Sequence, residues 1–225
     1  MEQRHFDKEL LQLKDKLLLM AARTEALINQ AIEALKKKDM PLAQDIFRLD
    51  KEIDGMEVEI EEQAISLIAL HQPAAGDLRF LIGAIKINND LERIGDHGVN
   101  IAESALRLAA QPDLKPLIDI PRMAVLATGM LKDSLDSFVS GDPGKARAVC
   151  MRDDQVDDLK DQIFRELLTF MMEKPDTITR AMDLILISRN LERIADLSTN
   201  ISEETIYIAE AKVIKHRADQ QQSCA

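Results

Sequence analysis

Two segments of the sequence carry the same spacing of acidic and amide side chains, in the pattern Glu-x-x-x-Asp-x-x-x-Asn. These residues are Glu92, Asp96 and Asn100 in the first copy and Glu192, Asp196 and Asn200 in the second. Side chains four residues apart stand one above the other on a helix, about 6 Å apart along its axis. Because like charges at this spacing repel each other, a cation bound between them would turn the repulsion into a binding site.

Two pairs of aspartates with the same four-residue spacing precede these segments. They are Asp50 and Asp54 in the first half and Asp153 and Asp157 in the second. If the two helices of each half are antiparallel neighbours, these aspartates complete each ligand set. Oxygen ligands without Cys or a second His favour Mg, Mn, Fe or Ca over a structural Zn site. We therefore predict divalent or ferric ions on carboxylate sites, with Fe, Mn, Mg and Zn as the candidates.

The acidic faces allow three interpretations. In the first, the faces are contact surfaces of a regulatory adaptor. In the second, they are the metal site of a helical-bundle hydrolase or oxidase. In the third, they are the solvated surface of a metal-free scaffold. No GxSxG, P-loop, HExxH or dinucleotide-binding motif is present. Di-iron bundle enzymes place their carboxylates on inward faces, whereas the pattern here lies opposite the apolar stripe. We therefore expect a protein that is not an enzyme and has no catalytic residues.

Apolar residues at seven-residue spacing mark the buried face of the same two helices. These stripes are Ile87, Ile94, Ile101 and Leu108, and Ile187, Ile194, Ile201 and Ile208. We expect the stripes in the core and the acidic residues at the surface. His97 is replaced by Leu197 in the second copy, so we expect a solvated or capping histidine. Arg93 and Arg193 are expected to pair with acidic side chains on a neighbouring helix.

Helical periodicity covers nearly the whole chain, and Pro, Gly and Asp interrupt it at five places. The six predicted helices run from about Phe6 to Lys37, Leu42 to Leu70, Asp77 to Ala110, Ile118 to Val139, Pro143 to Met172 and Asp176 to Lys215. The short connections predict antiparallel neighbours. The third and sixth helices match at an offset of 100 residues, and the second and fifth match at 103. The sequence thus predicts an all-α fold of two tandem, internally duplicated three-helix bundles, at 1–112 and 116–215, with a frayed tail at 216–225.

Composition limits the possible functions further. A net charge of −11 without a strong Lys/Arg cluster argues against nucleic acid as a partner. No 18-residue apolar run is present, and the first helix lacks the apolar core of a signal peptide. We therefore expect a cytoplasmic protein, in which Cys150 and Cys224 stay reduced.

Four segments together resemble the PhoU family of phosphate-uptake regulators. They are 72–79 (QPAAGDLR), 90–97 (DLERIGDH), 190–196 (NLERIAD) and 199–201 (TNI). Leu197 departs from the family pattern, which usually has His there. The resemblance implies two three-helix bundles, often dimeric, with multinuclear metal sites on the acidic motifs in some members. It also implies a cytosolic negative regulator that links the ATPase of the phosphate-specific ABC transporter to the sensor histidine kinase of the phosphate regulon. Such a protein is peripheral to the membrane only through these partners.

Overall fold

The computed structural model describes residues 2–212, and within them the chain is helical with no strand. The elements are α1 (Glu2–Lys37), α2 (Met40–His71), α3 (Ala75–Ala109), α4 (Asp119–Ser140), α5 (Pro143–Cys150), α6 (Asp153–Glu173), the short 3-10 helix η1 (Pro175–Thr177) and α7 (Ile178–Glu210). The all-α prediction is confirmed. The predicted tail at 216–225 lies outside the described residues, and so do the last residues of the predicted sixth helix. Within residues 2–212, no helix combines the length and the apolar character that a membrane span requires.

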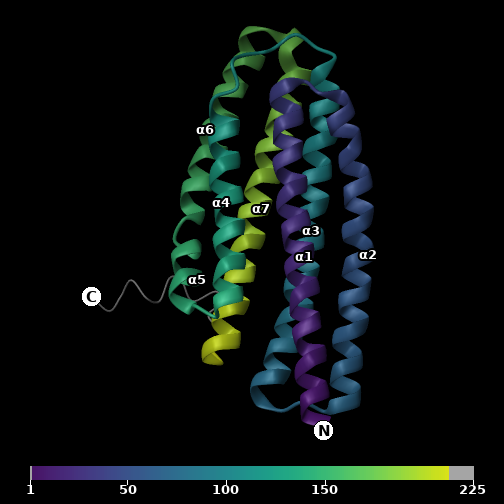
Figure 1. Cartoon of the computed structure of the whole chain (residues 1–225). Coiled ribbons are helices and arrows are strands. Elements are labelled where there is room, and N and C mark those ends of the chain that lie inside the picture. The colour runs from purple at the N-terminus through teal and green to yellow at the C-terminus, as the bar shows by residue number, and fades with distance from the viewer. Residues whose placement is uncertain (1, 213–225) are drawn as a thin grey trace, which may run out of the picture.

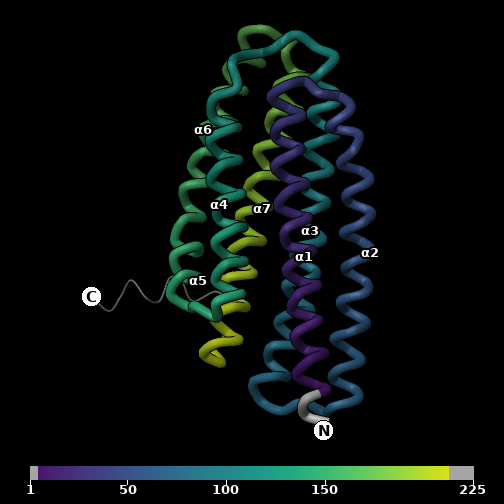
Figure 2. Tube along the Cα trace, viewed as in Figure 1, coloured from purple at the N-terminus to yellow at the C-terminus, as the bar shows by residue number. Residues whose placement is uncertain are grey.

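Two three-helix bundles stand side by side along their long axes (Figure 1). The first contains α1, α2 and α3, and the second contains α4, the successive α5 and α6, and α7. The linker between α3 and α4 crosses at one end of the molecule, as the tube in Figure 2 shows. The tandem duplication of a three-helix unit is therefore confirmed.

The helix boundaries follow from local capping chemistry. Asp39 caps α2, because its side chain accepts a hydrogen bond from the Leu42 amide. Asp142 caps α5 in the same way, through the amides of Gly144 and Lys145. A proline stands in the first turn of both helices, where its missing N–H costs nothing. The two capped helix starts lie at matching positions of the two repeats.

The predicted fifth helix differs from the structure, because it is broken at Met151 and Arg152 into α5 and α6. Arg152 reaches back across the bundle to α4, and its guanidinium pairs with the Asp133 carboxylate at 2.6 Å. The corresponding stretch of α2 is continuous. The helical period of the sequence runs through this position and therefore did not show the interruption.

The core includes the apolar stripes that the sequence predicts. Ile87, Ile94 and Ile101 and their counterparts in α7 are fully buried, while Leu108 and Ile208 at the stripe ends are partly buried. A Cβ added at Gly98 would lie 2.2 Å from Leu27 Cδ2 of α1, so a larger residue there would force the buried Leu27 side chain to shift.

Helices α3 and α7 lie antiparallel at the centre of the molecule and join the two bundles (Figure 1). Two ion pairs bridge them near opposite ends. Lys86 Nζ of α3 lies 3.0 Å from the Glu204 carboxylate of α7, and Arg107 Nε lies 2.7 Å from Asp183 Oδ1. Glu204 and Asp183 are buried, so each ion pair compensates a charge that would otherwise be costly at this interface.

Candidate functional site

Helices α2 and α3 pack against each other in the first repeat and bring their carboxylates together. The first acidic cluster consists of Asp50, Asp54 and Glu57 on α2 and Glu92 and Asp96 on α3. Asp50 reaches over α3, since a Cβ at Gly95 would lie 3.5 Å from Asp50 Oδ1. The structure thus places four of the predicted ligands at one groove. Sequence reasoning missed Glu57, although its position seven residues after Asp50 puts it on the same helix face.

Three carboxylates of this cluster, Asp50, Glu57 and Glu92, are harder to ionise than ordinary surface acids, because their pKa values are raised. Burial raises the pKa of Asp50 to about 6, with further contributions from the charges of Asp54 and Asp96. Burial also raises the pKa of Glu92, and the neighbouring Asp96 raises it further. Among the described residues, no side chain of the first acidic cluster takes part in an ion pair. The groove therefore concentrates negative charge that the protein itself does not neutralise.

The second repeat has an equivalent cluster between α6 and α7. The second acidic cluster consists of Asp153 and Asp157 on α6 and Glu192 and Asp196 on α7. Burial raises the pKa of Asp153 to about 6, followed by the charges of Asp196 and Asp157. Burial and then Glu192 raise the pKa of Asp196, while Arg193 opposes this shift. Both sets of four predicted carboxylates therefore meet in space.

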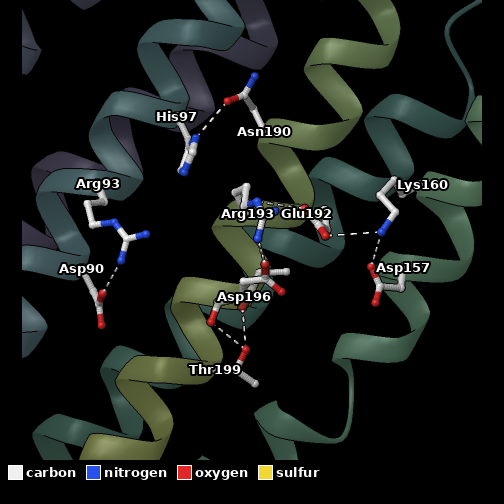
Figure 3. A network of polar contacts seen from close by, with 11 residues as sticks. Asp90, Arg93, His97, Asp157, Lys160, Asn190, Glu192, Arg193, Asp196 and Thr199 are labelled. Carbon is white, nitrogen blue, oxygen red and sulfur yellow. Dashed lines mark hydrogen bonds and ion pairs between the residues drawn. The ribbon is translucent and has the colours of Figure 1, made fainter.

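The second acidic cluster differs from the first because it contains its own cations (Figure 3). Lys160 Nζ lies 2.8 Å from Asp157 Oδ1 and 3.3 Å from Glu192 Oε1. Arg193 lies 2.9 Å from an Asp196 oxygen and 3.5 Å from Glu192 Oε2. At the repeat offset of 103, Lys160 corresponds to Glu57 of the first repeat. One position thus carries a positive charge in one repeat and a negative charge in the other.

The two predicted amide ligands take different positions in the structure. Asn100 lines a different groove, between α3 and α7, together with His97. Asn200 is half-buried on α7. Asp50, Glu92, Asp153 and Asp196 are half-buried rather than fully outward, because the two helices of each pair, α2 with α3 and α6 with α7, cover part of each other's acidic face. Across residues 2–212, no group of three His, Cys, Asp or Glu side chains has an arrangement that could hold a metal ion as it stands.

Two predictions about neighbouring residues are wrong. His97 is half-buried rather than fully solvated and caps no helix, since its Nδ1 lies 2.9 Å from Asn190 Oδ1 of the other repeat (Figure 3). Arg93 and Arg193 find their acidic partners on their own helices, at Asp90 and Asp196, three residues away. Contacts at this spacing need no packing between helices, which explains why they form in preference to the expected pairs.

Comparison with known proteins identifies the family. The chain matches the PhoU domain twice, at residues 17–105 and 120–205. It is 44% identical over 210 residues to the phosphate-specific transport system accessory protein PhoU homolog of Aquifex aeolicus, covering 93% of this chain and 95% of the relative. The homolog of Clostridium acetobutylicum is 40% identical over 215 residues, covering 95% and 98%.

Solved structures agree with the sequence relatives. The crystal structure of PhoU from Pseudomonas aeruginosa superposes with a TM-score of 0.90 at 35% identity, covering 92% of this chain and 100% of that chain. The phosphate transport system regulatory protein PhoU from Streptococcus pneumoniae gives a TM-score of 0.86 at 29% identity, covering 93% and 99%. With two matching domains, full-length relatives and the same fold, this chain belongs to the PhoU family.

Proposed function

We propose that this chain is a cytosolic negative regulator of phosphate uptake and of the phosphate-starvation response. Family membership supports a role in regulating phosphate transport, because its relatives are accessory proteins of the phosphate-specific transport system. In this proposal the chain acts as an adaptor that physically links the transporter ATPase to the sensor histidine kinase. It acts as a homodimer and reaches the membrane only through these partners.

The observation that carries the adaptor mechanism is the uncompensated charge of the first acidic cluster. Five carboxylates share one groove, and burial together with mutual repulsion raises the pKa of several of them. Bringing a positive charge to such a groove relieves the repulsion. A metal ion or a basic surface of a partner protein supplies that charge, and the two can act together if the ion bridges the partners.

The ligand chemistry of both clusters fits a hard divalent or ferric ion. In the first repeat Asp50, Asp54, Glu92 and Asp96 would hold it, with Asn100 at the edge. In the second repeat the corresponding residues are Asp153, Asp157, Glu192, Asp196 and Asn200. Because Lys160 already neutralises part of the second acidic cluster, we propose that the first repeat binds metal more tightly.

Glu57 and Lys160 occupy the same position of the two repeats, and reversing the charge of each tests the metal proposal. Glu57→Lys should lower the metal content of the first repeat, because a lysine would compete with the ion for Asp54 and Glu92. Lys160→Glu should raise the metal affinity of the second repeat. Both effects are measured as the metal content of the protein, determined by mass spectrometry after dialysis against a defined metal concentration. Equal metal content in the wild-type protein and both variants would refute the proposed difference between the repeats.

Charge reversal in the first acidic cluster tests the regulatory function. Glu92→Lys combined with Asp96→Lys should abolish repression, so that cells express a phosphate-starvation phosphatase reporter in phosphate-rich medium. A control with the same total charge change is Asp7→Lys combined with Asp136→Lys, at exposed residues outside both clusters. Circular dichroism and thermal melting should show that both variants stay folded. If the Glu92/Asp96 variant folds and represses like the control, the first acidic cluster is not a regulatory contact.

A further inference from the structure

A polar groove of about 390 Å³ lies between α3 and α7, on the seam that joins the two repeats. Its polar lining includes His97, Asn100 and Arg107 from α3 and Arg189, Asn190 and Arg193 from α7. The side chains that line it include three arginines and one acidic residue, Glu103. The charged side chains that line the groove are thus mostly positive, whereas the whole chain has a net charge of −11.

Arg107 is held in place by contacts that leave part of its guanidinium available. Its Nε donates to Asp183 Oδ1 at 2.7 Å, and one Nη donates to Ser104 Oγ at 2.9 Å. The other Nη lies 4.0 Å from the exposed Glu103 carboxylate, which is too far for a hydrogen bond. Because the buried Asp183 carboxylate holds Nε in place, the remaining N–H donors of the Arg107 guanidinium are oriented at low entropic cost.

The other two arginines add further donors from α7. Arg189 is exposed and takes part in no ion pair or hydrogen bond within residues 2–212. Arg193 uses Nη1 and Nε toward Asp196 and Glu192, which leaves its second Nη group. A guanidinium carries five N–H donors in a fixed planar fork that matches the oxygens of a phosphoryl group.

The contact between His97 and Asn190 determines which imidazole nitrogen faces the groove (Figure 3). The Asn190 amide nitrogen donates to the Leu186 carbonyl at 2.8 Å, so its Oδ1 accepts from His97 Nδ1. His97 therefore carries a proton on Nδ1. Its Nε2 makes no hydrogen bond among the described residues and is free for a ligand.

The internal duplication supplies an independent comparison. At the offset of 100 residues, Arg107, Arg189 and His97 correspond to Tyr207, Asn89 and Leu197. The symmetry-related end of the seam carries Lys86 and Arg93 together with three acids, Asp90, Glu203 and Glu204. The same helical framework is therefore basic at one end and acidic at the other. Duplication alone would have produced two similar ends.

We propose that this groove binds a small tetrahedral oxyanion, either as free inorganic phosphate or as the phosphoryl group of a larger molecule. Arg189 and Arg107 would bind its oxygens, and His97 and Asn100 would complete the hydrogen bonds. Such a ligand would contact both repeats at once, so its binding would stabilise one packing of α3 against α7. The proposal does not depend on the regulatory role or on metal in the acidic clusters.

Binding of inorganic phosphate to chelator-treated protein tests this proposal by titration calorimetry. Chelation removes metal that would itself attract phosphate. Wild-type protein should bind about one phosphate per chain at millimolar or lower concentration. Arg189→Gln should weaken binding about tenfold or more, as expected when a charge-assisted hydrogen bond is lost. Arg122→Gln, at an exposed residue on α4, is the matched control and should bind like the wild type.

A parallel titration with ADP distinguishes the two sources of the ligand. Tighter binding of ADP than of phosphate, with the same loss in Arg189→Gln, supports a phosphoryl group on a larger molecule. Equal or tighter binding of phosphate supports the free ion. Histidine-selective NMR should show the His97 ring resonance shifting on addition of the ligand that binds. Absence of binding by both ligands at millimolar concentration, or unchanged binding in Arg189→Gln, would overturn the proposal.

Discussion

Replacing Asp50 with asparagine should stabilise the metal-free protein at neutral and alkaline pH. The folded protein raises the pKa of Asp50 to about 6 through burial and the nearby carboxylates, whereas an unfolded aspartate has a pKa of about 3.9. The folded state therefore binds this proton more tightly than the unfolded state. The stabilisation from the neutral carboxyl is fully present below about pH 4 and is lost as the pH rises through about 6.

The size of the effect follows from the shift and from the exposure of the group. A two-unit shift corresponds to about 3 kcal/mol, but Asp50 is partly exposed and solvent screens its interactions. We therefore expect Asp50→Asn to raise the free energy of unfolding by about 1 kcal/mol at pH 8. For a chain of this length, that change corresponds to a rise in Tm of about 2–4 °C.

Denaturant unfolding at pH 5 and pH 8 in the presence of a chelator measures this difference. The difference in the free energy of unfolding between Asp50→Asn and the wild type should be larger at pH 8 than at pH 5, because the wild-type carboxylate is charged at pH 8. Asp136→Asn, at an exposed position on α4, should change stability equally at both pH values. Addition of a divalent metal should reverse the order if Asp50 is a ligand. A loss of stability in Asp50→Asn at pH 8 under chelation would refute the electrostatic reasoning.

Two further predictions concern the packing of α3. Gly98→Ala should lower the free energy of unfolding by about 1–3 kcal/mol, because the new methyl group would overlap the buried Leu27. Thermal melting measures this change. Gly55→Ala is the control that should not be destabilised, because a Cβ there meets nothing within 4 Å. Ile94→Asp should unfold the protein by placing an unpaired charge at a fully buried position; circular dichroism measures this, and retained native helicity and melting would contradict the assignment of Ile94 to the core.

The fold was predictable because its signals are local. The seven-residue apolar stripe around Ile94 and Ile194 determines which helix face is buried. Asp39 and Asp142, each followed closely by proline, mark helix starts with side chains that cap the next turn. The break at Met151 was missed because the helical period runs through it; the contact of Arg152 with α4 beside the break is visible only in the structure.

The candidate site was predictable only in part. The four-residue spacing placed Glu92 above Asp96, and helix pairing brought Asp50 to them, as the raised pKa values of Asp50 and Glu92 reflect. The same spacing suggested Asn100 as a further ligand, yet the structure places it at the groove between the repeats. Helix rotation decides such assignments, since a turn of some tens of degrees moves a side chain from one groove to the next.

The sequence by itself determined the helices, the duplication and the acidic character of both faces, because each depends on residue types at short, fixed spacings. Only the tertiary structure decided how the two repeats differ. Lys160 of α6 reaches Glu192 of α7, and His97 meets Asn190 although 93 residues separate them. Such contacts depend on how α3, α6 and α7 are rotated and shifted against one another, which the packing of the whole core fixes.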